Sequence, residues 1–164
     1  MRQARLPPLF LAIASAAVVG GALFSQYVGG LSPCELCLYQ RWPYYGVLAV
    51  ALVAALVGQR GLTRAVLVLA GLAFLAGGAL AFYHVGVEQG WFAGPDACTG
   101  PSLSGGSIAD LKAQLLATPP VRCDEVQWSL FGVSLAGWNF LASILLVAYC
   151  AVALVRRNIA AELK

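Results

Sequence analysis

The sequence has few charged residues, and this shortage excludes several classes of protein. Asp, Glu, Lys and Arg make up only 10% of the 164 residues, against about 25% in an ordinary soluble domain. So few charges cannot coat a water-soluble globule, and they leave no basic patch for nucleic acid. Disorder is excluded as well, because 60% of the residues are hydrophobic. The composition therefore predicts an integral membrane protein.

Long apolar stretches hold most of the hydrophobic residues. They cover residues 9–28, 42–57, 65–87 and 133–155. About 20 helical residues cross the hydrocarbon core, and the residues before 42 can lengthen the second stretch. Because backbone groups in lipid must bond within the chain, each stretch should be a helix. We expect a single all-α domain, a bundle of four transmembrane helices, with outer loops at 29–41 and 88–132.

The charges of the two signs fall on opposite sides of this arrangement. Seven of the ten basic residues share one side: Arg2, Arg5, Arg60, Arg64, Arg156, Arg157 and Lys164. Six of the seven acidic residues share the other: Glu35, Glu88, Asp96, Asp110, Asp124 and Glu125. Basic residues mark the cytoplasmic side, so both termini should be cytoplasmic. A cleaved signal peptide over about residues 1–25 is the alternative, but it would leave three spans and disturb this sorting.

The long outer loop divides into two parts. Gly, Pro and Ser dominate residues 94–107, which predicts coil. A short helix follows, capped by Ser104 or Ser107 and ended by Pro119 and Pro120. We expect this helix to lie on the membrane surface or to pack on top of the bundle.

Five cysteines are present, at 34, 37, 98, 123 and 150, and the first four fall outside the cytoplasm, where disulfides persist. Cys150 lies deep in the fourth apolar stretch, where a thiol is a small packing residue. Zinc is the other partner that four cysteines could hold. One Cys-x-x-Cys joined to two widely separated cysteines is not the doubled close pair of a zinc ribbon, so we expect no metal.

The Cys-Glu-Leu-Cys motif at 34–37 is predicted to begin the second helix. Ser32 and Glu35 have the spacing of a capping box, and Pro33 would occupy the first helical position. Unpaired N–H groups at a helix start favour a thiolate over a thiol, which makes the sulfur a nucleophile. Pro43 lies further along and should kink the same helix.

Arg41 follows Cys37 by four residues, so the two side chains share one helix face. At about 6 Å and an effective dielectric constant near 20, the attraction between guanidinium and thiolate is roughly 3 kcal/mol. Cys37 is therefore the expected stable thiolate. The alternative is an arginine that only anchors the helix end at the interface.

Cys98 and Cys123 lie in the long outer loop and can pair. A purely structural bridge is one interpretation. Next to a Cys-x-x-Cys in the same compartment, a second thiol pair can instead pass electrons by thiol–disulfide exchange. Access to an exposed loop also suits attack by a thiolate of another protein.

His84, the only histidine, lies near the outer end of the third apolar stretch, four residues before Glu88. An ionisable group within the membrane is a candidate functional residue, although a histidine bonded to a neighbouring helix is the alternative. Gln26 and Asn139 are expected to form hydrogen bonds between helices.

These features together closely resemble the DsbB family of bacterial disulfide bond formation proteins over essentially the whole chain. The motifs that carry the resemblance are Cys34-Glu-Leu-Cys37 with Arg41, the stretch 83–89 (Tyr-His-Val-Gly-Val-Glu-Gln), and Cys98 with Cys123. Some members of the family carry glutamine in place of Glu88, which leaves the role of Glu88 open.

The resemblance implies a quinone-dependent thiol oxidase, a protein-dithiol:quinone oxidoreductase of the bacterial inner membrane. Its partner would be a periplasmic thioredoxin-like (DsbA-like) oxidase, which attacks a Cys98–Cys123 disulfide and forms a mixed disulfide with Cys98. Cys123 would then attack Cys34 of a Cys34–Cys37 disulfide, and Cys37 would pass electrons to quinone from the membrane pool. The quinone, for which ubiquinone is favoured over menaquinone, would bind beside Cys37, Arg41 and His84.

Two other functions fit parts of the pattern. An enzyme similar to vitamin K epoxide reductase is also a four-helix thiol and quinone protein, but in that family the loop cysteines precede the Cys-x-x-Cys. A non-catalytic membrane assembly factor with two stabilising disulfides is the alternative of another class. It would reduce no quinone, and it would tolerate loss of Cys37.

Overall fold

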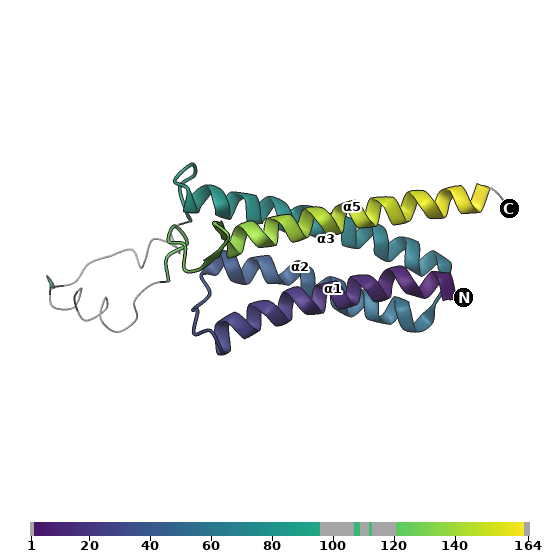
Figure 1. The fold of residues 1–164 in the computed structure, drawn as a ribbon, viewed down its shortest axis with the longest axis horizontal. Coiled ribbons are helices and arrows are strands. Elements are labelled where there is room, and N and C mark those ends of the chain that lie inside the picture. Colours follow the sequence, from purple (N-terminus) through teal and green to yellow (C-terminus); the bar gives the residue numbers. More distant parts are fainter. Residues whose placement is uncertain (1, 96–106, 109–111, 113–120, 163–164) are drawn as a thin grey trace.

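Four long helices make up most of the computed structural model, which describes residues 2–95, 107–108, 112 and 121–162. The helices are α1 (Arg2–Tyr27), α2 (Glu35–Val57), α3 (Arg60–Glu88) and α5 (Leu135–Glu162). Each is long and apolar enough to cross a membrane. The predicted all-α bundle of four membrane-spanning helices is therefore confirmed (Figure 1).

The helices differ from the apolar stretches at their ends. Helix α2 starts at Glu35, so the residues before 42 do extend it, and the first outer link is 28–34 instead of 29–41. Helix α3 runs on to Glu88. Hydropathy marks the part of a helix in the lipid, whereas hydrogen bonding and capping determine where the helix ends.

A small hairpin precedes α5, and the sequence analysis missed it. Strands β1 (Ser129–Leu130) and β2 (Val133–Ser134) pair antiparallel. The turn between them passes through Phe131 and Gly132, with φ of 53° and 77°. Two central residues at positive φ form the mirror-image type of turn that matches strand twist. Glycine adopts this backbone freely, but phenylalanine does so rarely, so the turn has only half of its usual sequence signature.

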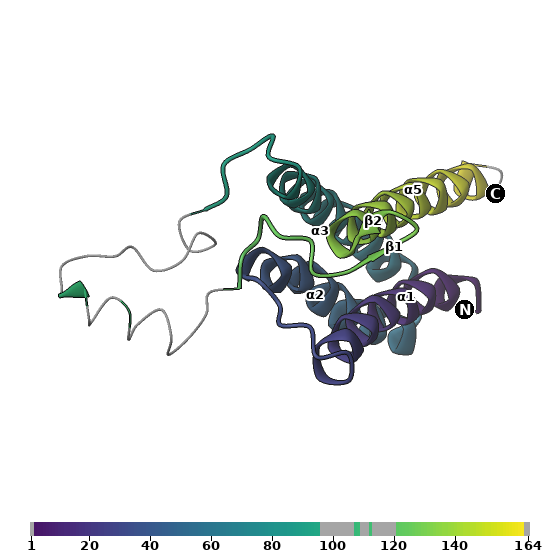
Figure 2. The same cartoon turned by 60° about the vertical axis from the view of Figure 1, so that its left-hand side comes forward.

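The arrangement of the helices brings both termini to one end of the bundle (Figure 1). Helix α1 lies beside α2, and α3 lies beside α5, as both views show (Figure 2). The α2–α3 link lies at the end with the termini. The 28–34 link and the hairpin lie at the opposite end. Residues far apart in sequence therefore meet at that second end.

The main core lies along the middle of the bundle and is closely packed. It includes Phe74, Leu67, Leu11 and Cys150. Cys150 is a free thiol, only 2% exposed, and packs as the small apolar residue that was predicted.

Glycines let α3 approach its neighbours. A Cβ on Gly77 would lie 3.2 Å from Cγ of Pro43, and one on Gly78 would lie 3.2 Å from Cβ of Ser143. Small residues of this kind allow membrane helices to pack with their backbones close together. Pro43 therefore packs its ring against α3 from within α2.

Part of the predicted outer loop lies outside the described residues. This applies to Cys98 and to almost all of the predicted coil and short surface helix. Gly94, Pro95, Ser107, Ile108 and Lys112 are the residues of that region that the structure describes.

Candidate functional site

Three side chains from separate segments converge at the hairpin end of the bundle. The sulfurs of Cys34 and Cys123 and a ring nitrogen of His84 all lie within 4.8 Å of one another, and all three residues are buried. Cys34 precedes α2, His84 belongs to α3, and Cys123 lies in the last part of the long outer loop, before the hairpin. Leu36 and Val87 pack around the sulfurs and shield them from water.

The thiols of Cys34 and Cys37 are both free, and they share one hydrogen bond with a sulfur–sulfur distance of 2.9 Å. Cys34 is itself the N-cap of α2, because its Sγ accepts a hydrogen bond from the backbone N–H of Cys37 at 3.3 Å. The start of this helix therefore donates to sulfur, as the motif suggested.

The predicted capping box is wrong. Ser32 and Pro33 precede the helix, and Glu35, at its first position, accepts from the hydroxyl of Tyr39 at 2.8 Å. Because the sulfur of Cys34 takes the capping position, the helix starts later than the Ser-x-x-Glu spacing implied.

The surroundings of Cys34 favour its thiolate. The hydrogen bond from the Cys37 thiol lowers the pKa of Cys34 to about 4, against an ordinary 9.0, and His84 and the backbone N–H of Cys37 act in the same direction. Burial opposes this shift but does not cancel it. The sequence-based expectation placed the stable thiolate at Cys37 because of Arg41. The structure corrects this: the thiolate is favoured at Cys34, because the Cys37 thiol hydrogen-bonds to it.

Cys123 forms a disulfide and is 1% exposed. Its predicted partner, Cys98, lies outside the described residues. The sulfur of a disulfide has no thiolate to offer a cation, so the group of Cys34, His84 and Cys123 does not make a metal centre in this oxidation state.

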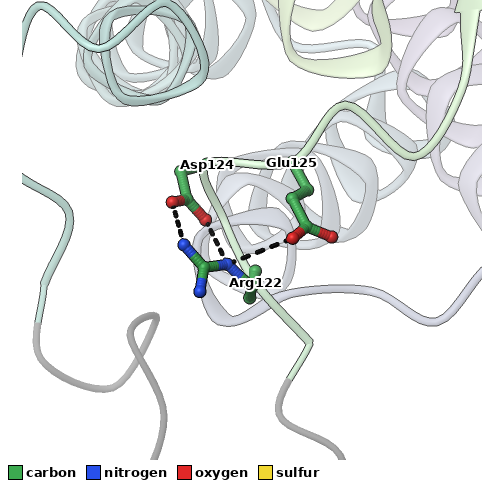
Figure 3. A network of polar contacts seen from close by, with 3 residues as sticks. All are labelled: Arg122, Asp124 and Glu125. Atoms are coloured by element: carbon green, nitrogen blue, oxygen red, sulfur yellow. Dashed lines mark hydrogen bonds and ion pairs between the residues drawn. The ribbon is translucent and has the colours of Figure 1, made fainter.

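Charged residues flank Cys123 on both sides (Figure 3). The guanidinium of Arg122 donates from Nε to Oδ1 of Asp124 at 3.0 Å and pairs with Oε1 of Glu125 at 3.2 Å. These exposed ion pairs contribute little to stability. They join side chains from either side of Cys123 in the sequence.

His84 is 3% exposed and contacts two groups through its two ring nitrogens. Nε2 lies 3.6 Å from Sγ of Cys34, and Nδ1 lies 2.7 Å from Nε2 of Gln40. The sequence analysis missed Gln40. A polar residue in an apolar helix, three positions after Cys37, was the available signal.

The hydrogen bonds continue from Gln40 into α5. Nδ2 of Asn139 donates to Oε1 of Gln40 at 2.5 Å, and the hydroxyl of Tyr44 donates to Oδ1 of Asn139 at 2.6 Å. The predicted interhelical role of Asn139 is therefore confirmed. Gln26 has a similar role between α1 and α2, because its Oε1 accepts from Nη1 of Arg41 at 2.7 Å.

A cavity of about 620 Å³ opens between α1, α2 and α5. Most of its wall is apolar, and its polar lining includes Cys37, Gln40, Arg41 and Asn139. An apolar cavity with a few convergent polar groups is the usual form of a small-molecule site. Cys37 and Arg41 therefore share one cavity, as their spacing predicted.

His84 does not line this cavity. It lies on α3 and reaches the cavity only through Gln40, so the structure places it against the Cys34 sulfur. Glu88 also lies away from the cavity lining, and its carboxylate accepts a hydrogen bond from the hydroxyl of Ser134. Glu88 thereby ties the end of α3 to β2.

Neighbouring thiols, a third sulfur held in a disulfide beside them and a cavity within a helical membrane bundle together define a membrane thiol–disulfide oxidoreductase. The family model described as "Disulfide bond formation protein DsbB" matches residues 4–153. The chain belongs to the DsbB family, which acts as an oxidoreductase in disulfide bond formation.

Relatives named Disulfide bond formation protein B match most of the chain. The one from Stutzerimonas stutzeri (strain A1501) is 30% identical over 96% of this chain and 100% of its own length. The relative from Hahella chejuensis (strain KCTC 2396) is 34% identical over 90% of each chain. The relative from Azoarcus sp. (strain BH72) is 35% identical over 82% of this chain and 83% of its own.

Proposed function

We propose that this chain is a quinone-dependent thiol oxidase of the bacterial inner membrane that reoxidises a periplasmic DsbA-like dithiol oxidase. One observation carries the proposal. The sulfur of Cys34 lies 2.9 Å from that of Cys37 and within 4.8 Å of that of Cys123. Exchange proceeds by attack of a thiolate on a disulfide sulfur, so this spacing supports transfer between a loop pair and the Cys-x-x-Cys pair.

The proposed relay has two exchanges. A thiolate of the partner attacks Cys98 in a Cys98–Cys123 disulfide, forms a mixed disulfide with Cys98 and releases Cys123 as a thiolate. Cys123 then attacks Cys34 in a Cys34–Cys37 disulfide, and Cys37 leaves as a thiolate. Each exchange forms one sulfur–sulfur bond and breaks another, so electrons pass inward without loss.

The cavity beside Cys37 suits a quinone, whose flat ring offers two carbonyl oxygens as acceptors and whose tail is apolar. Arg41 and Asn139 supply donors, and the surrounding wall is apolar. A bound quinone supplies the two-electron acceptor for the thiols. Arg41 would hold positive charge in the same cavity as Cys37, where it would stabilise a Cys37 thiolate and negative charge on a bound quinone. We favour ubiquinone over menaquinone.

The proposed orientation places the sulfurs on the periplasmic side. Arg5, Arg60, Arg64 and Arg157 belong to the end of the bundle that holds both termini and the α2–α3 link. Arginines near helix ends favour the cytoplasmic face, and disulfides persist on the opposite one. Both termini are therefore assigned to the cytoplasm.

The function is tested by following quinone absorbance in purified protein while a reduced thioredoxin-like partner is added. Wild type should consume quinone, Cys98→Ala should consume almost none, and Arg41→Gln should be slowed by about 100-fold. Cys150→Ala is the matched control, because it removes a thiol outside the relay. Equal consumption by wild type and Cys98→Ala would refute the relay order, and no consumption by wild type would favour the non-catalytic assembly factor.

The inward exchange is tested by trapping. A Cys37→Ala, Cys98→Ala variant keeps Cys34 and Cys123 without their proposed partners, and it should form a Cys34–Cys123 bridge that non-reducing peptide mapping detects. Adding Cys123→Ala should abolish the bridge. If the double variant forms no bridge in the membrane, the proposed transfer between the pairs is wrong.

A further inference from the structure

A continuous line of hydrogen bonds joins the reactive sulfur to the interior of the bundle. It runs from Cys34 to His84, Gln40, Asn139 and Tyr44, and so connects α2, α3 and α5. All of these polar groups lie in or next to membrane-spanning helices, where an unmatched donor or acceptor is costly. Each group along the line must therefore offer a donor to one neighbour and an acceptor to the other, in the same order throughout.

The direction can be followed from the tyrosine end. A carbonyl oxygen only accepts, so Oδ1 of Asn139 accepts from the Tyr44 hydroxyl, and its amide nitrogen faces Gln40. Oε1 of Gln40 accepts from that nitrogen, which leaves Nε2 of Gln40 as the donor to Nδ1 of His84. With Nδ1 as acceptor, the proton of the ring is on Nε2.

The same direction follows from the sulfur end. A thiolate only accepts, and Nε2 of His84 lies 3.6 Å from Sγ of Cys34. A protonated Nε2 can therefore donate to the Cys34 thiolate. The opposite tautomer would direct the lone pair of Nε2 at this negative charge. The side-chain amides of Gln40 and Asn139 would then both have to exchange the positions of their oxygen and nitrogen.

We propose that Gln40, oriented by Asn139 and Tyr44, is a positioning residue that holds His84 in the Nε2–H tautomer so that the ring donates to the Cys34 sulfur. The proposal rests on the proposed function and deepens it. It gives His84 a task at the thiol pair in place of the one expected at the quinone ring.

The assisted step is the one in which Cys34 leaves. The second thiolate of the partner first attacks the partner's sulfur in the mixed disulfide, which breaks the bond to Cys98 and releases Cys98 as a thiolate. That thiolate attacks Cys123 in the Cys34–Cys123 bridge, a Cys98–Cys123 bond forms, and the Cys34–Cys123 bond breaks. The electron pair of the broken bond remains on Cys34. His84 keeps its proton and donates a hydrogen bond to that charge, so no further oxidant or acid is needed. A hydrogen bond to the charged form of a leaving thiol makes it leave faster.

Nitrogen NMR of the full-length reduced protein, solubilised without added quinone or partner, tests the tautomer directly. The chain has one histidine, so ¹⁵N-histidine labelling with a histidine-free purification tag reports His84 alone. We expect a protonated Nε2 and an unprotonated, hydrogen-bonded Nδ1. A protonated Nδ1 with an unprotonated Nε2 would overturn the proposal.

Variants along the line provide a second test by the same spectrum. Gln40→Leu and Tyr44→Phe should each give a mixture of tautomers, although Tyr44→Phe touches neither His84 nor a cysteine. Ser143→Ala is the matched control. Its hydroxyl lies 2.9 Å from that of Tyr44, but the predicted direction needs no acceptor there, so the spectrum should remain that of wild type. An unchanged spectrum in Gln40→Leu would refute the positioning role.

The reduction potential of the Cys34–Cys37 pair is a third readout, measured against dithiothreitol in a Cys98→Ala, Cys123→Ala background. Loss of the hydrogen bond in Gln40→Leu should destabilise the reduced pair and favour its disulfide by about tenfold, a fall of about 30 mV. An unchanged potential would overturn the proposal. Failure of the proposed function is separable, because it appears as absent quinone consumption by wild type, and these measurements use no quinone.

Discussion

At the scale of single residues, the sulfur of Cys34 has three close partners. It shares a hydrogen bond with the Cys37 thiol, accepts from the backbone at the start of α2 and faces Nε2 of His84. The sulfur of Cys123 lies within 4.8 Å. In the relay that we propose, this position would let Cys34 receive an attacking sulfur and hold the charge when it leaves.

The lowered pKa of Cys34 predicts a thiolate at unusually low pH. Because the folded pKa is about 4 and the ordinary value is 9.0, its stabilising effect is complete above pH 9 and is lost as pH falls through 4. Stability of the reduced protein should therefore rise with pH between these values. In a variant that keeps only Cys34 and Cys37, thiolate absorbance near 240 nm should persist at pH 6.

Two controls accompany that titration. Adding Cys34→Ala should remove the absorbance at pH 6, and adding His84→Leu should move its loss to higher pH because one stabilising partner is gone. In the variant that keeps both Cys34 and Cys37, loss of the thiolate absorbance already near pH 9 as the pH is lowered would contradict the prediction.

At the scale of elements, α2 organises the site. Gln40 and Arg41 follow Cys37 by three and four residues, and Tyr44 follows Gln40 and Arg41 by four and three. These helical spacings place all four on one side of the helix. All four line the cavity, and Gln40 also bonds to His84 on α3. The position and rotation of α2 against its neighbours therefore decide the geometry of both the sulfurs and the cavity.

Close packing of α3 against α5 should depend on Gly78. Its missing Cβ would lie 3.2 Å from Cβ of Ser143, so Gly78→Val should overpack the interface and cost about 1–3 kcal/mol. Unfolding in mixed micelles with a rising fraction of dodecyl sulfate measures this cost.

A matched control comes from the exposed side of α2. Apart from its chain neighbours and the backbone of its own helix, no heavy atom lies within 4 Å of a Cβ built on Gly46, so Gly46→Val should leave the unfolding midpoint nearly unchanged. Equal midpoints for both variants would show that the α3–α5 contact is looser than described.

At the scale of the whole molecule, the two ends of the bundle differ in chemistry. One end holds both termini and most arginines, and the other holds the sulfurs and the hairpin (Figure 1). A membrane orients such a molecule, because basic residues near the helix ends are retained in the cytoplasm. In the orientation that we propose, the bundle would present the sulfurs of Cys34, Cys37 and Cys123 to the oxidising compartment.

Orientation is testable by labelling from one side. In a variant without native cysteines, Lys112→Cys should react with a membrane-impermeant maleimide added to intact spheroplasts, and Gln59→Cys should react only after lysis. Residue 59 lies in the α2–α3 link. Labelling of residue 59 from outside the intact cells would reverse the assigned topology.

The sequence alone determined the four membrane-spanning helices, because the length and apolarity of a span are properties of one segment. It also identified the thiol pair with Arg41 and the interhelical role of Asn139, since helical spacing and a polar group in an apolar stretch are local features. The start of α2 at Glu35 and the hairpin turn at Phe131 escaped it. At both places an unusual residue type occupies the position. A cysteine serves as the helix cap, and a phenylalanine occupies a turn position with positive φ.

Only the tertiary structure decided which groups meet across helices. It placed Cys34 beside Cys123, turned His84 away from the cavity toward sulfur, and linked His84 to α5 through Gln40. Such contacts depend on the rotation and depth of each helix relative to its neighbours. Close packing across all the helix interfaces sets these two quantities together, and no single segment encodes them.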